Sequence, residues 1–296
     1  MEVTRISEVL AKMYFDSKES FYLIGEGAFN NVYILHDEDA LKTLKKYGIH
    51  TDIVFRISKD GLNGKKQKMF FQESQMAKLM GSKNVSPIVF DDALVHNDSN
   101  NKVYGVQIME RMSGTISSLL EKKNLDINEL YNIIQQCLDI LFKVIDYGTY
   151  CIDINLSNFL YMRAANGNIT VYMTDYDVAF CGKDTRELIS RNMYYFKSFS
   201  AILFLINTVS AEKRVKKLLG RLQDDFNLDL CSSVSKIQKY LLGKDLYTLV
   251  VNQDDDVPKD IQRLLWYMIN NDKESVEDIL KSIDEICSVM KYTLKK

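Results

Sequence analysis

The sequence predicts an α+β protein in which a β-rich N-terminal part precedes a mainly helical C-terminal part. Short runs of β-prone residues dominate up to about residue 112, and apolar residues then recur at helical spacing through most of 113–296. Strands and helices segregated along a chain in this way are typical of α+β proteins rather than of alternating βα units. We therefore expect two domains, 1–112 and 113–296.

The first domain is expected to contain a five-stranded sheet and one helix. The strands are predicted at 21–24, 31–35, 51–57, 86–95 and 103–112, and the helix at 68–80. The second domain is expected to contain one short strand among helices. That strand is predicted at 168–174, and the helices at 116–122, 127–146, 193–208, 211–223, 232–242, 259–271 and 274–291.

Composition and charge exclude several classes of protein. A hydrophobic share of 46% and a charged share of 26% are ordinary for a globular protein, and a net charge of −2 does not indicate a nucleic-acid-binding surface. No apolar run is long enough to span a membrane, and the N-terminus lacks the layout of a signal peptide. The five cysteines contain no CxxC pair, which favours a reducing, cytoplasmic location over a disulfide framework or a zinc site.

A glycine-containing turn separates the first two expected strands. It reads I-G-E-G-A-F-N-N-V, and Gly25 and Gly27 would let backbone N–H groups approach a phosphate closely. A plain hairpin turn is the alternative interpretation of the same residues. A dinucleotide-binding Rossmann turn is less favoured, because a strand rather than a helix follows.

Polar residues also interrupt an apolar segment, C-I-D-I-N-L-S-N-F-L, at 151–160. A buried polar group without a partner costs roughly 2–7 kcal/mol on transfer scales, so either neighbours or a ligand must satisfy Asp153 and Asn158. Asp175 follows the short strand expected at 168–174. Oxygen atoms of this kind are the ligands that Mg²⁺ prefers.

The order of these segments resembles that of the eukaryotic protein kinase superfamily, and the resemblance spans most of the chain. The matching segments are G-E-G-A-F-N-N-V, the strand with Arg56, the helix with Glu73, D-I-N-L-S-N and D-Y-D. The resemblance implies a bilobal protein kinase-like fold with a β-rich N-lobe and an α-helical C-lobe. It also implies ATP and Mg²⁺, or Mn²⁺, as cofactors.

The resemblance implies a role for each matching residue. Asp153 is expected to be the catalytic base, Asn158 and Asp175 the metal ligands, and Arg56 with Glu73 the phosphate-side ion pair. Met109 would line the adenine pocket, and backbone groups of Glu110 and Met112, the two hinge residues, would bind the adenine edge. The nucleotide-binding set is Gly25, Gly27, Val32, Val54, Arg56, Met109, Glu110 and Met112.

The chain departs from the kinase pattern in several places. Arg56 stands where the family has Lys, a replacement that is not conservative, and Lys42 and Lys59 are alternative cations. Alternation along the third strand places Val54 and Arg56 on one face, which favours Arg56. Cys151-Ile152 replaces His-Arg, D-Y-D replaces D-F-G, and fewer than twenty residues separate Asp175 from the helix expected near Asn192.

Three functions remain compatible with these residues. The first is an ATP- and Mg²⁺-dependent phosphotransferase, an atypical serine/threonine protein kinase. The second is a pseudokinase that acts as a binding or scaffold module, because the strand Lys and the His-Arg pair are replaced. The third is a small-molecule kinase of the aminoglycoside or choline type. Some large-DNA-virus kinases share the D-aromatic-D motif and the short segment, which suggests a viral protein in the host cytoplasm; the acceptor or protein partner is not indicated.

Overall fold

The computed structural model confirms the α+β class and describes most of the first 227 residues. The described ranges are 5–27, 29–36, 38–122, 125–151, 154–176, 179–180 and 183–227. The chain divides into two compact units. One comprises Met1–Ser113 with Thr174–Asp177, and the other comprises Gly114–Met173 with Val178–Lys296.

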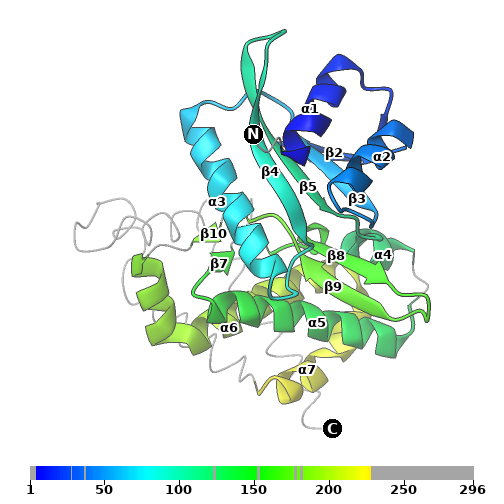
Figure 1. Cartoon of the computed structure of the whole chain (residues 1–296). Coiled ribbons are helices and arrows are strands. Elements are labelled where there is room, and N and C mark those ends of the chain that lie inside the picture. Colours follow the sequence, from blue (N-terminus) through cyan, green and yellow to red (C-terminus); the bar gives the residue numbers. More distant parts are fainter. Residues whose placement is uncertain are drawn as a thin grey trace. The chain divides into compact units, whose positions relative to one another are not determined.

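The first unit is built on a five-stranded antiparallel sheet with the strand order β1-β2-β3-β5-β4 (Figure 1). The strands are β1 (Phe21–Glu26), β2 (Asn30–Leu35), β3 (Ile53–Ser58), β4 (Val89–Asn97) and β5 (Lys102–Glu110). Burial alternates along the start of β3, where Ile53 and Phe55 are buried and Val54 and Arg56 are partly exposed. Successive side chains of a strand point to opposite faces, so this pattern defines two distinct faces of the sheet.

Three helices of the first unit accompany the sheet in the described residues: α1 (Ile6–Asp16), α2 (Glu38–Lys46) and α3 (Gly64–Gly81). The sequence pattern predicted only α3. In α1, Leu10 and Tyr14 are buried one helical turn apart, and they pack on one face of the sheet with Leu44 of α2. The shared core comprises Ile6, Leu10, Ala11, Tyr14, Phe21, Tyr33, Leu44, Ile49, Ile53, Phe55, Ile57, Val106 and Ile108.

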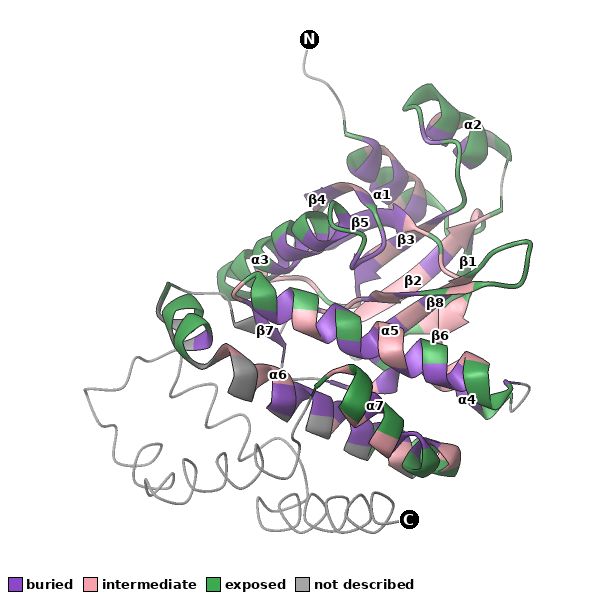
Figure 2. Ribbon diagram, turned by 90° about the horizontal axis from the view of Figure 1, so that it is seen from below, coloured by how far each residue is buried: buried purple, intermediate pink, exposed green. Residues whose placement is uncertain are grey.

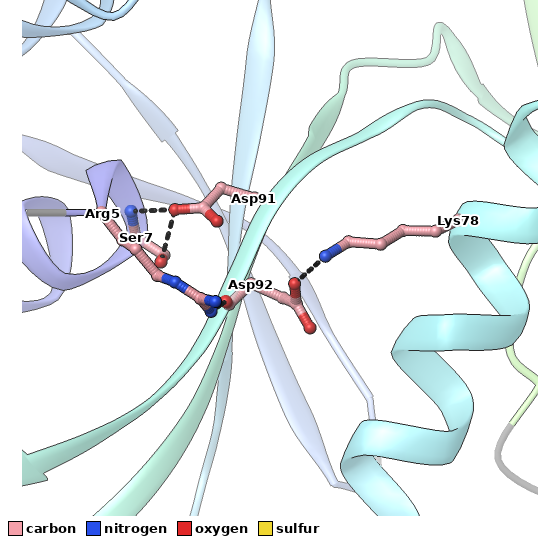
Figure 3. A network of polar contacts seen from close by, with 5 residues as sticks. All are labelled: Arg5, Ser7, Lys78, Asp91 and Asp92. Atoms are coloured by element: carbon pink, nitrogen blue, oxygen red, sulfur yellow. Dashed lines mark hydrogen bonds and ion pairs between the residues drawn. The ribbon is translucent and has the colours of Figure 1, made fainter. Parts of the chain in front are cut away.

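Two consecutive aspartates of β4 connect the sheet to helices on its two sides (Figure 3). The carboxylate of Asp91 accepts hydrogen bonds from the backbone N–H and the Oγ of Ser7 in α1, at 3.0 Å and 2.7 Å. The carboxylate of Asp92 forms an ion pair with Lys78 of α3, and its carbonyl accepts from the Arg5 side chain at 2.9 Å. Because neighbouring strand residues face opposite ways, α1 and α3 cover opposite faces.

The second unit combines short strands with longer helices. Its three-stranded sheet has the order β6-β8-β9, and a further pair joins β7 and β10. The strands are β6 (Gly114–Thr115), β7 (Tyr150–Cys151), β8 (Phe159–Arg163), β9 (Ile169–Met173) and β10 (Ala179–Phe180). The helices are α4 (Ile116–Glu121), α5 (Ile127–Asp146), α6 (Lys183–Ala211) and α7 (Leu219–Asp225), with the 3₁₀ turns η1 (Leu156–Asn158) and η2 (Lys213–Lys217).

Helix α5 forms the centre of the second unit, where it packs against α6 and β9. The Asp126 carboxylate accepts from the N–H groups of Asn128 and Glu129, which satisfies two of the donors that a helix start leaves open. Figure 2 shows buried and exposed segments alternating along α5, as expected for an amphipathic helix. Nearby, the rings of Phe159 and Phe204 meet edge to face at 5.3 Å.

The second unit differs from the sequence prediction in its strands and in its helix limits. Only 168–174 was predicted as a strand, whereas β6, β7, β8 and β10 are also present. Three of these have two residues each, which is too short to produce an alternating pattern. Helix α6 begins at Lys183 instead of 193, and 211–223 divides into η2 and α7. The helices predicted at 232–242, 259–271 and 274–291 lie outside the described residues.

No helix in the described part of the chain combines the length and the apolar character that a membrane crossing requires.

Candidate functional site

Most of the expected nucleotide-binding side chains lie on the sheet face that α3 covers. Arg56 of β3 lies opposite Val32 of β2 and Gln107 of β5, and Val54 lies opposite Met109. Directly opposed residues of neighbouring strands point to the same face. We call this face, with Val32, Val54, Arg56, Asp92, Gln107 and Met109, the α3 face; Asp92 belongs to it because it lies opposite Gln107. The other, with Ile53, Phe55, Ile57, Val106 and Ile108, is the α1 face.

The ion pair between Arg56 and Glu73 is the first feature of this site. Arg56 Nη1 donates to the Glu73 carboxylate and, at 2.8 Å, to Oε1 of Gln107. The Arg56 and Glu73 side chains are only 15% and 8% exposed. A carboxylate this buried needs a charged or hydrogen-bonding partner, since an uncompensated buried charge is strongly destabilising. Glu73 is therefore held in the interface between α3 and the sheet.

Asp175 approaches the same guanidinium from a segment far along the chain. Thr174–Asp177 belongs to the first compact unit, and Oδ1 of Asp175 lies 3.9 Å from Nη2 of Arg56. Asp175 has a φ of +67°, in the left-handed region that a non-glycine residue adopts at a cost of roughly 1–3 kcal/mol. Such conformations cluster at functional sites. Arg56 therefore lies between two carboxylates, Glu73 and Asp175.

Neither alternative cation takes this position. Lys59 Nζ pairs with Glu26 at 2.6 Å, and the hydrogen bond and charge of Lys59 lower the pKa of Glu26. Lys42 lies on α2 with a side chain that is 63% exposed, and it pairs with Glu38 one helical turn earlier. Arg56 is the cation that the structure places beside Glu73.

The glycine turn forms the β1–β2 hairpin, where Gly27 N–H donates to the Asn30 carbonyl at 2.9 Å. A Cβ added at Gly25 would lie 3.6 Å from Val32 Cβ, and one at Gly27 would lie 3.5 Å from the Asn30 oxygen. These are ordinary contact distances. By contrast, a Cβ at Gly105 would come within 2.6 Å of the Phe70 ring. Packing thus requires a glycine at 105 but leaves room for a side chain at 25 and 27.

The hinge residues follow the α3 face at the end of β5. Met109 is 5% exposed, and the Glu110 N–H donates to the Ile88 carbonyl at 2.8 Å. This N–H therefore already has a protein acceptor and is not available to an adenine edge. Met112 comes after the end of β5 and is partly exposed.

The second unit holds the segment around the expected catalytic loop. Asp153 lies outside the described residues. Asn158 ends η1 and is 7% exposed, and its N–H donates to the Asn155 carbonyl at 3.1 Å. Asn155 caps the same turn by accepting from the Ser157 N–H at 2.9 Å. Asn207 of α6 donates to the Ile154 carbonyl at 2.6 Å, which ties this segment to the helix.

Sequence reasoning missed two residues of these networks. Gln107 was signalled by a polar side chain within the otherwise apolar strand segment V-Q-I-M, but its partner Arg56 is 51 positions away. Asn207 lies in α6 without any local motif, and its acceptor is 53 positions away. Residues so far apart along the chain form no local sequence pattern, so neither hydrogen bond could be predicted from one.

No protein-family model matches the chain, and no curated protein matches it either. Within the described residues, no group of three or more His, Cys, Asp or Glu side chains is arranged to hold a metal ion. The kinase resemblance, the viral origin and the roles of ATP and Mg²⁺ therefore stay predictions.

Proposed function

We propose that this protein is an ATP- and Mg²⁺-dependent phosphotransferase with a protein kinase-like fold, acting as an atypical serine/threonine kinase. The observation that supports this most is the position of Arg56 between Glu73 and Asp175. In protein kinases, a strand cation paired with a helix glutamate binds the nucleotide phosphates beside a metal-binding aspartate. The same three kinds of residue occur here, in the same order along the chain.

The residues would divide the chemistry between binding and proton transfer. Phosphoryl transfer depends mainly on positioning and charge, so a fixed guanidinium that can contact phosphate oxygens is a useful group. Arg56 would bind the phosphates, while Asp175 and Asn158 would hold Mg²⁺, which usually takes few protein ligands and is completed by water and phosphates. Asp153 would accept the proton of the acceptor hydroxyl.

Nucleotide binding tests this proposal directly. We expect calorimetry to detect ATP binding that requires Mg²⁺ or Mn²⁺, and we expect Asp175→Asn to weaken it at least about tenfold by removing the metal-binding charge. Asp98→Asn is the matched control, because it makes the same change at a carboxylate that is 99% exposed in the first unit. If the wild-type protein binds no nucleotide with either metal, the proposed phosphotransferase function is excluded.

One observation favours a pseudokinase as the second candidate. Arg56 is shared by Glu73, Gln107 and Asp175, so its contacts could stabilise the α3 face without any nucleotide. A pseudokinase would show no phosphoryl transfer to any protein acceptor under conditions where the fold is intact. Transfer that is lost in Asp153→Asn, with unchanged ATP affinity, would exclude this candidate.

The acceptor class can be narrowed by the segment after Asp175. Helix α6 begins at Lys183, which leaves only 176–182 for the segment that seats a peptide in protein kinases. This short connection favours a small acceptor, as in the aminoglycoside or choline kinase alternative. Parallel transfer assays with protein substrates and with hydroxyl-bearing metabolites would separate the two.

A further inference from the structure

We propose that Gln107 is a positioning residue, which orients the guanidinium of Arg56 so that Nη2 faces Asp175. This inference rests on the proposed phosphotransferase function, since it assigns the geometry of the phosphate-binding cation. Gln107 lies directly opposite Arg56 in the neighbouring strand, and it is fully buried on the α3 face.

The hydrogen bonds of Nη1 determine the plane of the guanidinium. Nη1 carries two hydrogens, and its two acceptors are the Glu73 carboxylate and Gln107 Oε1, from α3 and β5. Because the group is planar and rigid, two acceptors from separate elements leave it little freedom to rotate. With Nη1 fixed in this way, Nη2 lies 3.9 Å from Asp175 Oδ1.

The orientation of the Gln107 amide is fixed by its partner. Arginine only donates hydrogen bonds, so the amide oxygen must face it and Nε2 must point away. Nε2 is buried and has no hydrogen-bond partner among the described residues. A buried donor left in this state is unfavourable, whereas an apolar side chain of similar volume would avoid the problem. The amide is therefore explained by the acceptor that it presents to Arg56 rather than by stability.

The identity of the cation explains why such an acceptor is useful. A lysine ammonium can rotate its N–H donors and so can pair with one carboxylate without a second partner. The N–H donors of a guanidinium, by contrast, point in fixed directions within one plane. With Glu73 as the only acceptor for Nη1, the head group could pivot away from Asp175. We therefore expect Gln107 to affect Mg²⁺-ATP affinity when position 56 is arginine and to affect it little when position 56 is lysine.

A double-mutant cycle tests this dependence. The wild type, Q107M, R56K and R56K/Q107M are compared for Mg²⁺-ATP affinity by calorimetry and for melting temperature. We expect Q107M to weaken binding about tenfold in the wild-type background, the size expected for losing one hydrogen bond to a charged group, and less than about twofold in the R56K background. The melting temperature of Q107M is expected to be equal to or higher than that of the wild type.

A second readout needs no nucleotide. Side-chain nitrogen NMR of the guanidinium, assigned by the signals that R56K removes, should show slow rotation of the Arg56 Nη groups in the wild type and faster rotation in Q107M. The inference is overturned if Q107M changes Mg²⁺-ATP affinity equally in the wild-type and R56K backgrounds, or if the Arg56 Nη groups rotate equally fast in the wild type and in Q107M. A Q107M protein that fails to fold would also overturn it.

The two proposals fail in distinguishable ways. If the wild type binds no nucleotide, the proposed function and the phosphate-binding part of this inference are overturned together, and slow rotation lost in Q107M would still establish the orienting contact. If the wild type binds and Q107M binds equally well, this inference alone is overturned.

Discussion

The two faces of the five-stranded sheet are made by the same strands but differ in chemistry. On the α1 face, Phe55 packs among aromatic rings, with centroids 5.0 Å from Phe21 and 5.5 Å from Tyr14. On the α3 face, its neighbour Arg56 takes part in a network of charged and amide groups with Glu73 and Gln107. The first face is packed mainly with aromatic and aliphatic side chains, whereas the second organises charged and amide groups.

This difference separates stability from function along a single strand. Burial of apolar side chains supplies most of the free energy of folding, and the α1 face contains a large aromatic and aliphatic core. The hydrogen-bonded charges of the α3 face add little net stability, because each must first be removed from water. Adjacent residues of β3 are therefore expected to respond to substitution in different ways.

The largest expected effect is on the α1 face. Phe55 is fully buried, so Phe55→Ala should lower the free energy of unfolding by about 3–5 kcal/mol, measured by chemical denaturation. Val54→Ala, one residue earlier and only partly buried, is the comparison and should cost clearly less. Equal losses for the two variants would contradict the distinction between the faces.

A smaller effect is expected where α3 closely approaches the sheet. In Gly105→Ala the new methyl group would lie 2.6 Å from Phe70 Cδ2, so the ring or α3 must shift. The free energy of unfolding, measured by thermal denaturation, should therefore fall by about 1–3 kcal/mol. Gly27→Ala is the matched glycine control and should change the unfolding free energy by less than about 0.5 kcal/mol. If Gly27 approaches a phosphate, that control should still weaken ATP binding.

The smallest of these effects concerns the attachment of α1. Asp91→Ala removes the acceptor for the Ser7 N–H and Oγ, and should cost about 1 kcal/mol, as for the loss of a helix cap. Hydrogen exchange should become faster in α1 and stay unchanged in α3. Faster exchange confined to α3 would mean that Asp91 stabilises the other face.

Local patterns are sufficient to predict much of the sheet and part of the site. Alternation along β3 predicts that Arg56 and the buried Phe55 point to opposite faces. The pairing of Arg56 with Glu73, which the structure shows, was expected only from the resemblance to protein kinases. Helix α2 escaped prediction because most of its nine residues are polar. The burial spacing of α1 is helical, but it becomes meaningful only once the sheet face that it covers is known.

The remaining parts of the site depend on contacts between distant segments. Gln107 becomes Arg56's partner only through the register of β3 against β5, and Asn207 reaches Ile154 only through the packing of α6. No local signal in the sequence identifies either of these two pairs of partners. The expected base Asp153 lies outside the described residues, so its role stays a prediction.

The adjacent aspartates of β4 have a consequence for strand alignment. A shift of β4 by one residue against β5 would turn Asp91 toward α3 and Asp92 toward α1, because side chains alternate strictly between the faces. A shift in one direction would place Phe90 opposite Ser7, and a shift in the other would place Ala93 opposite Lys78, so one of the two helices would lose its polar anchor. The chain already contains one irregularity between Val89 and Asp91. Asp91 and Asp92 together thus favour the observed alignment of β4, because Ser7 of α1 and Lys78 of α3 both have a carboxylate acceptor in it and a shift of one residue leaves one of them without.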